Sequence, residues 1–168
     1  INAFKVMKNK IACVIVEPIA GNMNMIKPIP GFLETIKDLC QLSGAVLIFD
    51  EVMTGFRVAK GGAQSIYGIK PDITTLGKII GGGLPAAAFG GRKDIMSHLA
   101  PEGPVYQAGT LSGNPIAMIA GLVTLKSMEV DNFHKSLDVK CGALMKGMSE
   151  IAKTFDQPLQ VTHLGGMF

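Results

Sequence analysis

Two short, unbroken apolar runs with an amphipathic stretch between them constrain the fold of this chain more than any other feature. Residues 11–16 and 45–49 are continuously apolar and rich in β-branched side chains, which is typical of strands that helices cover on both faces. Between them, apolar positions recur at helical spacing over residues 31–43, and Gly44 is placed to end that helix. Strand, helix, strand in this order predicts a βαβ unit with parallel strands.

The rest of the chain extends the same architecture. Weaker strands are predicted at residues 73–76 and 86–89, and helices at 92–99, 115–128 and 133–154. Asn114 and Pro115 open the second of these helices with a capping side chain and a proline at the first helical position. No internal repeat or second domain boundary interrupts the 168 residues. We therefore predict one α/β unit with a mainly parallel sheet flanked by helices.

Composition and charge exclude several classes of function. Only 17% of the residues are charged and 21 are glycine, which is expected when much of the surface meets other protein. The net charge of +3 is spread thinly with few aromatic residues nearby, so no nucleic-acid partner is predicted. The longest apolar run has six residues, far short of the ~20 that cross a bilayer, so no membrane span is predicted. Because the chain begins at Ile1 and ends in a turn-like segment, we expect it to be a fragment.

The cysteines and histidines show no spacing typical of a metal site. Cys13, Cys40 and Cys141 are far apart and odd in number, which favours reduced, packed thiols and a cytoplasmic location. The three histidines have no partner at metal-ligand spacing, and no G-x-S-x-G elbow is present. We therefore predict neither a metal centre nor a serine hydrolase site.

Polar residues that follow the apolar runs are the first candidates for chemistry, because ligands of open parallel sheets bind beyond the carboxyl ends of the strands. Asp50 follows residues 45–49 directly, and is either a site carboxylate or a structural cap or ion-pair partner. Lys78 lies in an almost uncharged, glycine-rich stretch. Desolvation would lower the pKa of its amine and make it a nucleophile for carbonyls, whereas the plain alternative is a surface lysine. Glu17, Asn22 and Glu51 complete the set of candidates.

Two familiar phosphate motifs do not fit the glycine-rich stretch. A P-loop needs Ser or Thr after Lys78, where Ile79 stands, and a dinucleotide fingerprint needs a third glycine and a helix, where Pro85 and Ala86 follow. The glycines are better explained by backbone flexibility and close approach. Residues 106–115 combine hydroxyls and small residues before a helix, which suits an oxyanion or phosphate and equally suits a capping loop.

Taken together, these segments resemble the class III aminotransferase family of pyridoxal-phosphate enzymes. The resemblance covers most of residues 11–128 and rests on four motifs, at residues 16–23, 49–57, 76–83 and 103–115. It implies the large, cofactor-binding domain of a fold-type I transferase. It also implies that residues 1–168 are only part of that domain, with an N-terminal segment, the phosphate-binding cup and the small C-terminal domain outside them.

The resemblance assigns a role to each matched residue. Lys78 would form the Schiff base with the cofactor aldehyde and later move protons, and Asp50 would keep the pyridine nitrogen protonated. Val52 would pack on the ring face. Gly109 and Thr110 would reach the cofactor phosphate of the neighbouring subunit, which implies a homodimer with shared sites.

Two positions indicate which branch of the family the chain resembles. Aminotransferases of the family typically carry Glu and Gln where this chain has Asn22 and Met53. Asn22 would instead contact the phenolic oxygen of the cofactor, which alternates between pyridoxal and pyridoxamine phosphate. The resemblance therefore implies an internal amine exchange that converts glutamate 1-semialdehyde to 5-aminolevulinate for tetrapyrrole synthesis. An ω-aminotransferase, and a fragment inactive in isolation, remain the alternatives.

Overall fold

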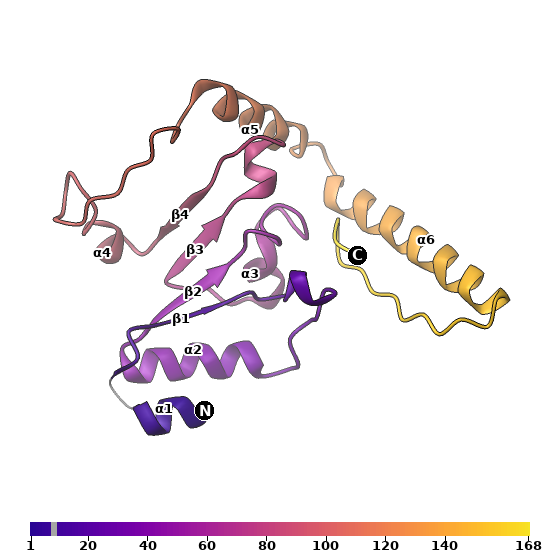
Figure 1. Ribbon diagram of the computed structural model, residues 1–168, viewed down its shortest axis with the longest axis horizontal. Helices are drawn as coiled ribbons and strands as arrows, with labels where there is room; N and C mark the ends of the chain where they lie inside the picture. The colour runs from indigo at the N-terminus through magenta and orange to yellow at the C-terminus, as the bar shows by residue number, and fades with distance from the viewer. Residues whose placement is uncertain (8–9) are drawn as a thin grey trace.

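The computed structural model describes residues 1–7 and 10–168, and four strands within them form one sheet in the order β1-β2-β3-β4. β1 (Cys13–Val16), β2 (Val46–Asp50) and β3 (Ile73–Leu76) are parallel, and β4 (Ala88–Gly91) is antiparallel to β3 (Figure 1). This confirms the predicted α/β class and the mainly parallel sheet. The carboxyl ends of β2 and β3 therefore lie at the same edge.

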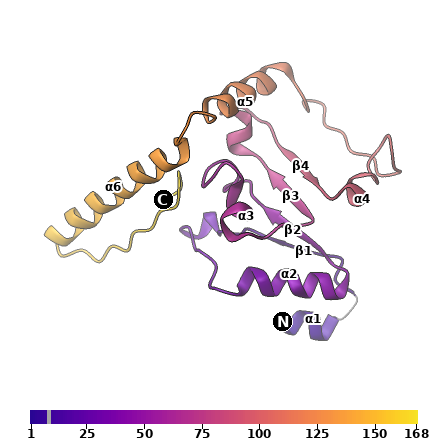
Figure 2. The same ribbon diagram turned by 180° about the vertical axis from the view of Figure 1, so that it is seen from behind.

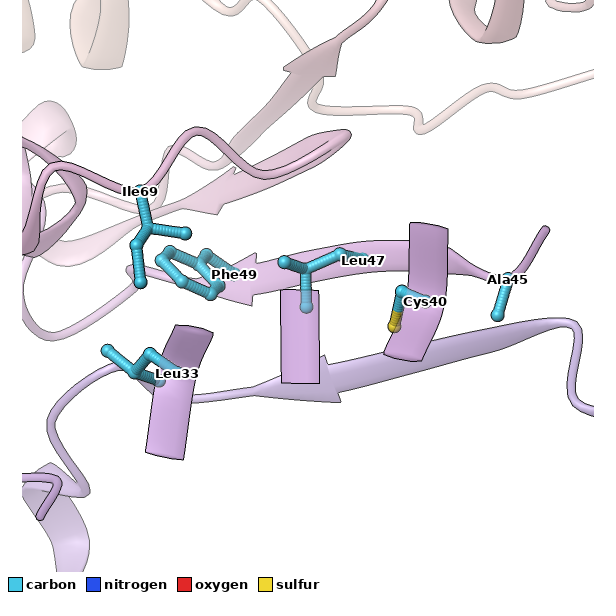
Figure 3. Close-up of a cluster of buried hydrophobic side chains, with 6 residues drawn as sticks. All are labelled: Leu33, Cys40, Ala45, Leu47, Phe49 and Ile69. Carbon is cyan, nitrogen blue, oxygen red and sulfur yellow. The ribbon is translucent and has the colours of Figure 1, made fainter. Parts of the chain in front are cut away.

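The βαβ unit is the best-packed part of the chain. α2 (Phe32–Ser43) lies against β1 and β2, and its apolar face meets Leu47 and Phe49 of β2 (Figure 3). Both of these side chains are almost completely buried. Burial of each side chain of this size stabilises the fold by about 1.5–3 kcal/mol relative to exposure. The remaining buried members of this cluster are Leu33, Cys40, Ala45 and Ile69.

Three predicted helices are confirmed, two of them with the caps that the sequence indicates. α2 ends at Gly44, which has a φ of 73° and the left-handed conformation of a glycine cap. α5 (Pro115–Ser127) begins after Asn114, whose side-chain oxygen accepts a hydrogen bond from the Ala117 backbone N–H. α6 (Phe133–Thr154) has the predicted bounds.

Three predicted elements, the first strand, the last strand and the short helix after it, have bounds that differ from the prediction by more than one residue. β1 is shorter than residues 11–16, and Ile15 is 59% exposed, so the prediction of two covered faces fails for the described residues. α5 does not cover the exposed face of β1, because it packs instead on the turn after β3. β4 begins at Ala88, not at residue 86, because pairing starts opposite Leu76, the last residue of β3. α4 (Lys93–Met96) is shorter than residues 92–99.

The early end of α4 has a local cause. Beyond Met96 the backbone N–H groups of His98 and Leu99 donate to the carbonyl oxygens only three residues back, those of Ile95 and Met96. The chain therefore tightens into 3-10-type turns, and the α-helix ends at Met96. Four short elements were not predicted, namely α1 (Asn2–Met7), α3 (Gly62–Tyr67) and the 3-10 turns η2 (Gly21–Met23) and η3 (Lys78–Gly81).

The C-terminal segment returns to the loop that follows β2. α6 projects away from the sheet, and the chain after it runs back along the helix (Figures 1 and 2). There the backbone N–H of Gly166 donates to the carbonyl oxygen of Arg57 (3.0 Å), and Met167 joins a second buried cluster. The other buried residues of that cluster are Ile19, Met25, Val58 and Ala63.

Candidate active site

The predicted site residues of the sheet lie at one edge. Asp50 is the last residue of β2 and pairs in register with Thr75 of β3, and Lys78 follows the end of β3 by two residues. Because β2 and β3 are parallel neighbours, both side chains emerge where the strands end. The sequence prediction that Asp50 and Lys78 share this edge is therefore supported by the topology.

The Asp50 carboxylate is held through one of its two oxygens. Oδ1 accepts hydrogen bonds from the backbone N–H of Val52 (3.0 Å) and from the Thr75 hydroxyl (3.3 Å). No hydrogen bond to Oδ2 is found from the residues that the structure describes. The carboxyl is thus oriented by the protein, and one oxygen can accept a hydrogen bond from a ligand.

Lys78 has an unusual backbone but an ordinary exposure. It begins η3 with a φ of +46°, a left-handed conformation that non-glycine residues rarely adopt and that is enriched at functional sites. Its side chain is exposed, so among the described residues the surface-lysine alternative describes Lys78 better than a desolvated amine does. The glycine-rich sequence around Lys78 does not bury its side chain, because the turn lies at the edge of the sheet.

Close packing of glycines fixes the turn that carries Lys78. η3 packs on α5, where a side chain at Gly121 would overlap the Ile80 carbonyl oxygen. Gly82, with a φ of +58°, ends η3, and a side chain there would overlap the Ala120 carbonyl. The predicted close approach of the backbone is therefore confirmed at Gly82, whereas the predicted flexibility stays a prediction.

Val52 lies between the two strand ends. Its methyl group is 3.3 Å from the position that a Cβ at Gly77 would occupy, so it packs on the backbone just before Lys78. Val52 and Gly109 line a cleft of about 1040 Å³ between the sheet and the segment before α5. Thr110 does not line it, and residues 104–113 are exposed throughout.

Asn22 and Met53 come from different loops that touch. Asn22 is exposed in η2, and its neighbour Gly21 packs so closely on Met53 that a Cβ at Gly21 would overlap the Met53 sulfur. The Glu17 carboxylate accepts a hydrogen bond from the Gly21 backbone N–H (2.9 Å) and holds η2 in place. The two positions that distinguish the branches of the family are therefore adjacent in space.

The structure adds residues that the sequence analysis did not single out. Arg57 lines a cleft of about 670 Å³ together with Lys78 and Met53, and its Nε donates to the Met53 carbonyl oxygen (2.8 Å). His134 of α6 donates from Nε2 to the carbonyl oxygen of Phe56 (2.9 Å). The His134–Phe56 contact spans 78 residues, so no local pattern predicts it.

The groups with shifted pKa values lie away from this edge. Burial raises the pKa of the Cys40 thiol, with smaller contributions from Asp72 and Cys13. At the opposite end of the sheet, a hydrogen bond from Arg92 lowers the pKa of Asp94. Cys40 and Cys141 are buried as predicted, but Cys13 is exposed, because it lies with Ile15 on the exposed face of β1.

Across the described ranges 1–7 and 10–168, no group of three or more His, Cys, Asp or Glu residues is arranged to hold a metal ion. Within the same ranges, no helix is both long and apolar enough to cross a membrane.

The sequence places the chain in a family. It matches the family described as Aminotransferase class-III over residues 1–168, so the chain belongs to this family. It is 59% identical over 165 residues to glutamate-1-semialdehyde 2,1-aminomutase of Francisella philomiragia. This alignment covers 98% of this chain and 38% of that protein. The same enzyme of Herminiimonas arsenicoxydans is 59% identical over 167 residues, or 99% of this chain and 39% of that protein.

Solved structures show the same fold. An omega-transaminase from Sphaerobacter thermophilus superposes with a TM-score of 0.90 at 34% identity, over 98% of this chain and 38% of that one. A glutamate-1-semialdehyde aminomutase from Pseudomonas aeruginosa PAO1, in complex with PMP, superposes with a TM-score of 0.80 at 24% identity, over 96% and 38%. The chain thus spans about two fifths of the length of these relatives.

Proposed function

We propose that the full-length protein is a glutamate-1-semialdehyde 2,1-aminomutase that uses pyridoxal phosphate and its pyridoxamine form. The observation that carries the proposal is the placement of Asp50 and Lys78 at the ends of neighbouring parallel strands. This observation is made in a chain that is 59% identical to such enzymes.

The residues at this edge fit the cofactor. The Asp50 Oδ2 atom is available to accept a hydrogen bond from a protonated pyridine nitrogen, and Lys78 supplies the amine that an aldehyde requires. Val52 offers an apolar surface for one face of the ring. When bound, pyridoxal phosphate supplies an electron sink for the carbanion left after proton loss.

Each residue then has one task in the proposed reaction. Asp50 keeps a proton on the ring nitrogen, and Val52 orients the ring. Lys78 would hold the cofactor while it is in its aldehyde form, and would carry protons between the two substrate carbons. In the net reaction the amine changes from C2 to C1 and the carbonyl from C1 to C2. The oxygen of C1 leaves as water and water supplies the oxygen at C2, so substrate and product are isomers and no second substrate is consumed.

Asn22 and Met53 favour the mutase over an aminotransferase. An uncharged Asn22 would not pair with the arginine that binds a keto acid in the aminotransferases of the family, so the switch between two substrates is missing. A class III ω-aminotransferase is the second candidate, because an omega-transaminase has the same fold with a TM-score of 0.90. The packing of Gly21 on Met53 supports a joint role of these two loops in the choice.

We further propose that the enzyme is a cytoplasmic homodimer. α5 is apolar on all sides, and Ile116, Ile119 and Val123 are 74%, 60% and 60% exposed, as expected of a helix that another chain covers. The exposed residues Gly109 and Thr110 are available to reach the phosphate of a partner's cofactor. The free thiols support the proposed location. The family's phosphate-binding cup lies outside residues 1–168, so we expect the isolated chain to be inactive.

Turnover without a keto acid tests the proposed function. Full-length enzyme that has been loaded with pyridoxamine phosphate and freed of excess cofactor is given glutamate 1-semialdehyde, and 5-aminolevulinate is measured. Many turnovers per site are expected with no keto acid added or formed. A reaction that stops after one equivalent and resumes only when an external amine donor is added, which returns the cofactor to its pyridoxamine form, would establish the aminotransferase instead.

A further inference from the structure

Glu51 is a buried carboxylate directly beside the proposed cofactor partner Asp50. Only 1% of Glu51 is exposed, and Oε2 accepts hydrogen bonds from the Thr54 hydroxyl (2.8 Å) and the Ala63 backbone N–H (2.6 Å). Oε1 accepts from the backbone N–H (2.9 Å) and the side-chain amide (3.1 Å) of Gln64. Every partner is a donor, which suits an ionised carboxylate because that group only accepts.

These four hydrogen bonds close a loop. Ala63 and Gln64 lie 12 and 13 residues after Glu51, so the carboxylate ties the start of residues 51–64 to their end. Thr54, the nearer donor, is completely buried. At Gly62 the φ is +68°, and a side chain would overlap the carboxylate, so the loop is shaped around this group.

The closed loop carries residues of the proposed site. Val52 is held between Glu51 and Thr54, and its backbone N–H is one of the two donors that orient Asp50. The side chain of Val52 packs against Gly77, next to Lys78. Any release of the Glu51 end of the loop therefore moves the Asp50 carboxylate and the surface proposed for the ring together.

We propose that Glu51 is a positioning residue, which holds Asp50 and Val52 in the geometry that the cofactor ring requires. The inference rests on the proposed function, because it assigns Glu51 a role toward the cofactor. Glu51 itself is not proposed to touch the ring. It acts through the loop, so its removal should weaken cofactor binding more than a comparable loss of stability elsewhere.

The substitution Glu51→Gln tests this role with little change of shape. The new amide places a donor against groups that already donate, which leaves buried donors unpaired. Thr54→Val removes one of the four hydrogen bonds, and Thr54→Ser keeps it. Asp72→Asn is the matched control, because Asp72 also accepts a backbone N–H, from Leu47 (2.8 Å), but lies at the opposite end of the sheet.

The measurement is a titration of full-length apoprotein with pyridoxal phosphate, followed by visible absorbance, alongside thermal unfolding of each apoprotein. Glu51→Gln is expected to raise the Kd for the cofactor at least about tenfold, a change of about 1.4 kcal/mol. Thr54→Val should raise it less, and Thr54→Ser should not. Asp72→Asn should lower the melting temperature without changing the Kd. The pH dependence of the bound cofactor's absorbance should shift in Glu51→Gln alone.

The outcomes separate this inference from the proposed function. If the wild-type protein does not bind the cofactor, both fail. If it binds normally and Glu51→Gln changes the Kd no more than Asp72→Asn does, Glu51 is purely structural and only this inference is overturned. If Glu51→Gln does not fold, Thr54→Val decides in the same way, by comparison with Thr54→Ser.

Discussion

Gly121→Ala sets two opposing effects against each other in α5. Alanine is a better helix former than glycine by about 1 kcal/mol, so propensity alone predicts stabilisation. The new methyl group, however, would overlap the carbonyl oxygen of Ile80, which belongs to the backbone of η3. Overpacking of this kind costs about 1–3 kcal/mol, and the upper end applies because a backbone atom moves less easily than a side-chain end.

The net effect follows from the difference of the two terms. We expect Gly121→Ala to destabilise the protein by about 2 kcal/mol, because the steric cost exceeds the gain in propensity. The shift of α5 should also displace η3 and Lys78, so cofactor binding should weaken in parallel.

Gly147→Ala is the matched control. Gly147 lies in the interior of α6, and a Cβ there would meet nothing within 4 Å. Only the propensity term remains, so this variant should gain about 0.5–1 kcal/mol. Urea unfolding of the two full-length variants, followed by far-UV circular dichroism, measures both free energies of unfolding. If Gly121→Ala were as stable as Gly147→Ala, the packing of α5 on η3 described above would be wrong.

Three further predictions concern single groups. Asp50→Ala should lower turnover by orders of magnitude with little loss of stability, because the ring nitrogen loses its partner; near-normal activity would make Asp50 merely structural. Asn114→Ala should cost about 1 kcal/mol in urea unfolding, because the Ala117 N–H loses its cap; an unchanged midpoint would contradict this. Burial raises the pKa of Cys40 and thus lowers its thiolate fraction, so iodoacetamide at pH 8 should modify it slowly in the native protein and rapidly after unfolding. Equal rates would show that Cys40 is not buried.

The elements that the sequence predicts well are those whose signals are local. α6 has a long amphipathic pattern, and its predicted bounds are correct. α2 and α5 carry their own caps, and the apolar runs around α2 mark β1 and β2. In each case the residues that determine the element lie within it or next to it.

The elements that the sequence does not predict depend on distant partners. α3 begins at Gly62 without a capping side chain of its own, and Glu51 binds its first N–H groups from earlier in the chain. The exposure of Lys78 depends on where η3 sits on α5, which no composition argument reveals. The same is true of the Gly21–Met53 contact, which joins two loops.

The site is predictable to the extent that strand ends define it. Asp50 and Lys78 follow apolar runs, and the rule for parallel sheets places them at one edge. The hydrogen bonds that orient Asp50 come from the next strand and from the loop, so their geometry appears only in the structure. Roles for Gly109 and Thr110 rest on family resemblance and stay predictions.

The most direct test of the central claim is to trap the cofactor on the protein. Full-length enzyme is incubated with pyridoxal phosphate, reduced with borohydride, digested and analysed by peptide mass spectrometry. One dominant pyridoxyl-modified peptide that contains Lys78 is expected, and this label should be lost in Lys78→Ala while the fold is retained. Stoichiometric labelling of a different lysine, with Lys78 unmodified, would contradict it.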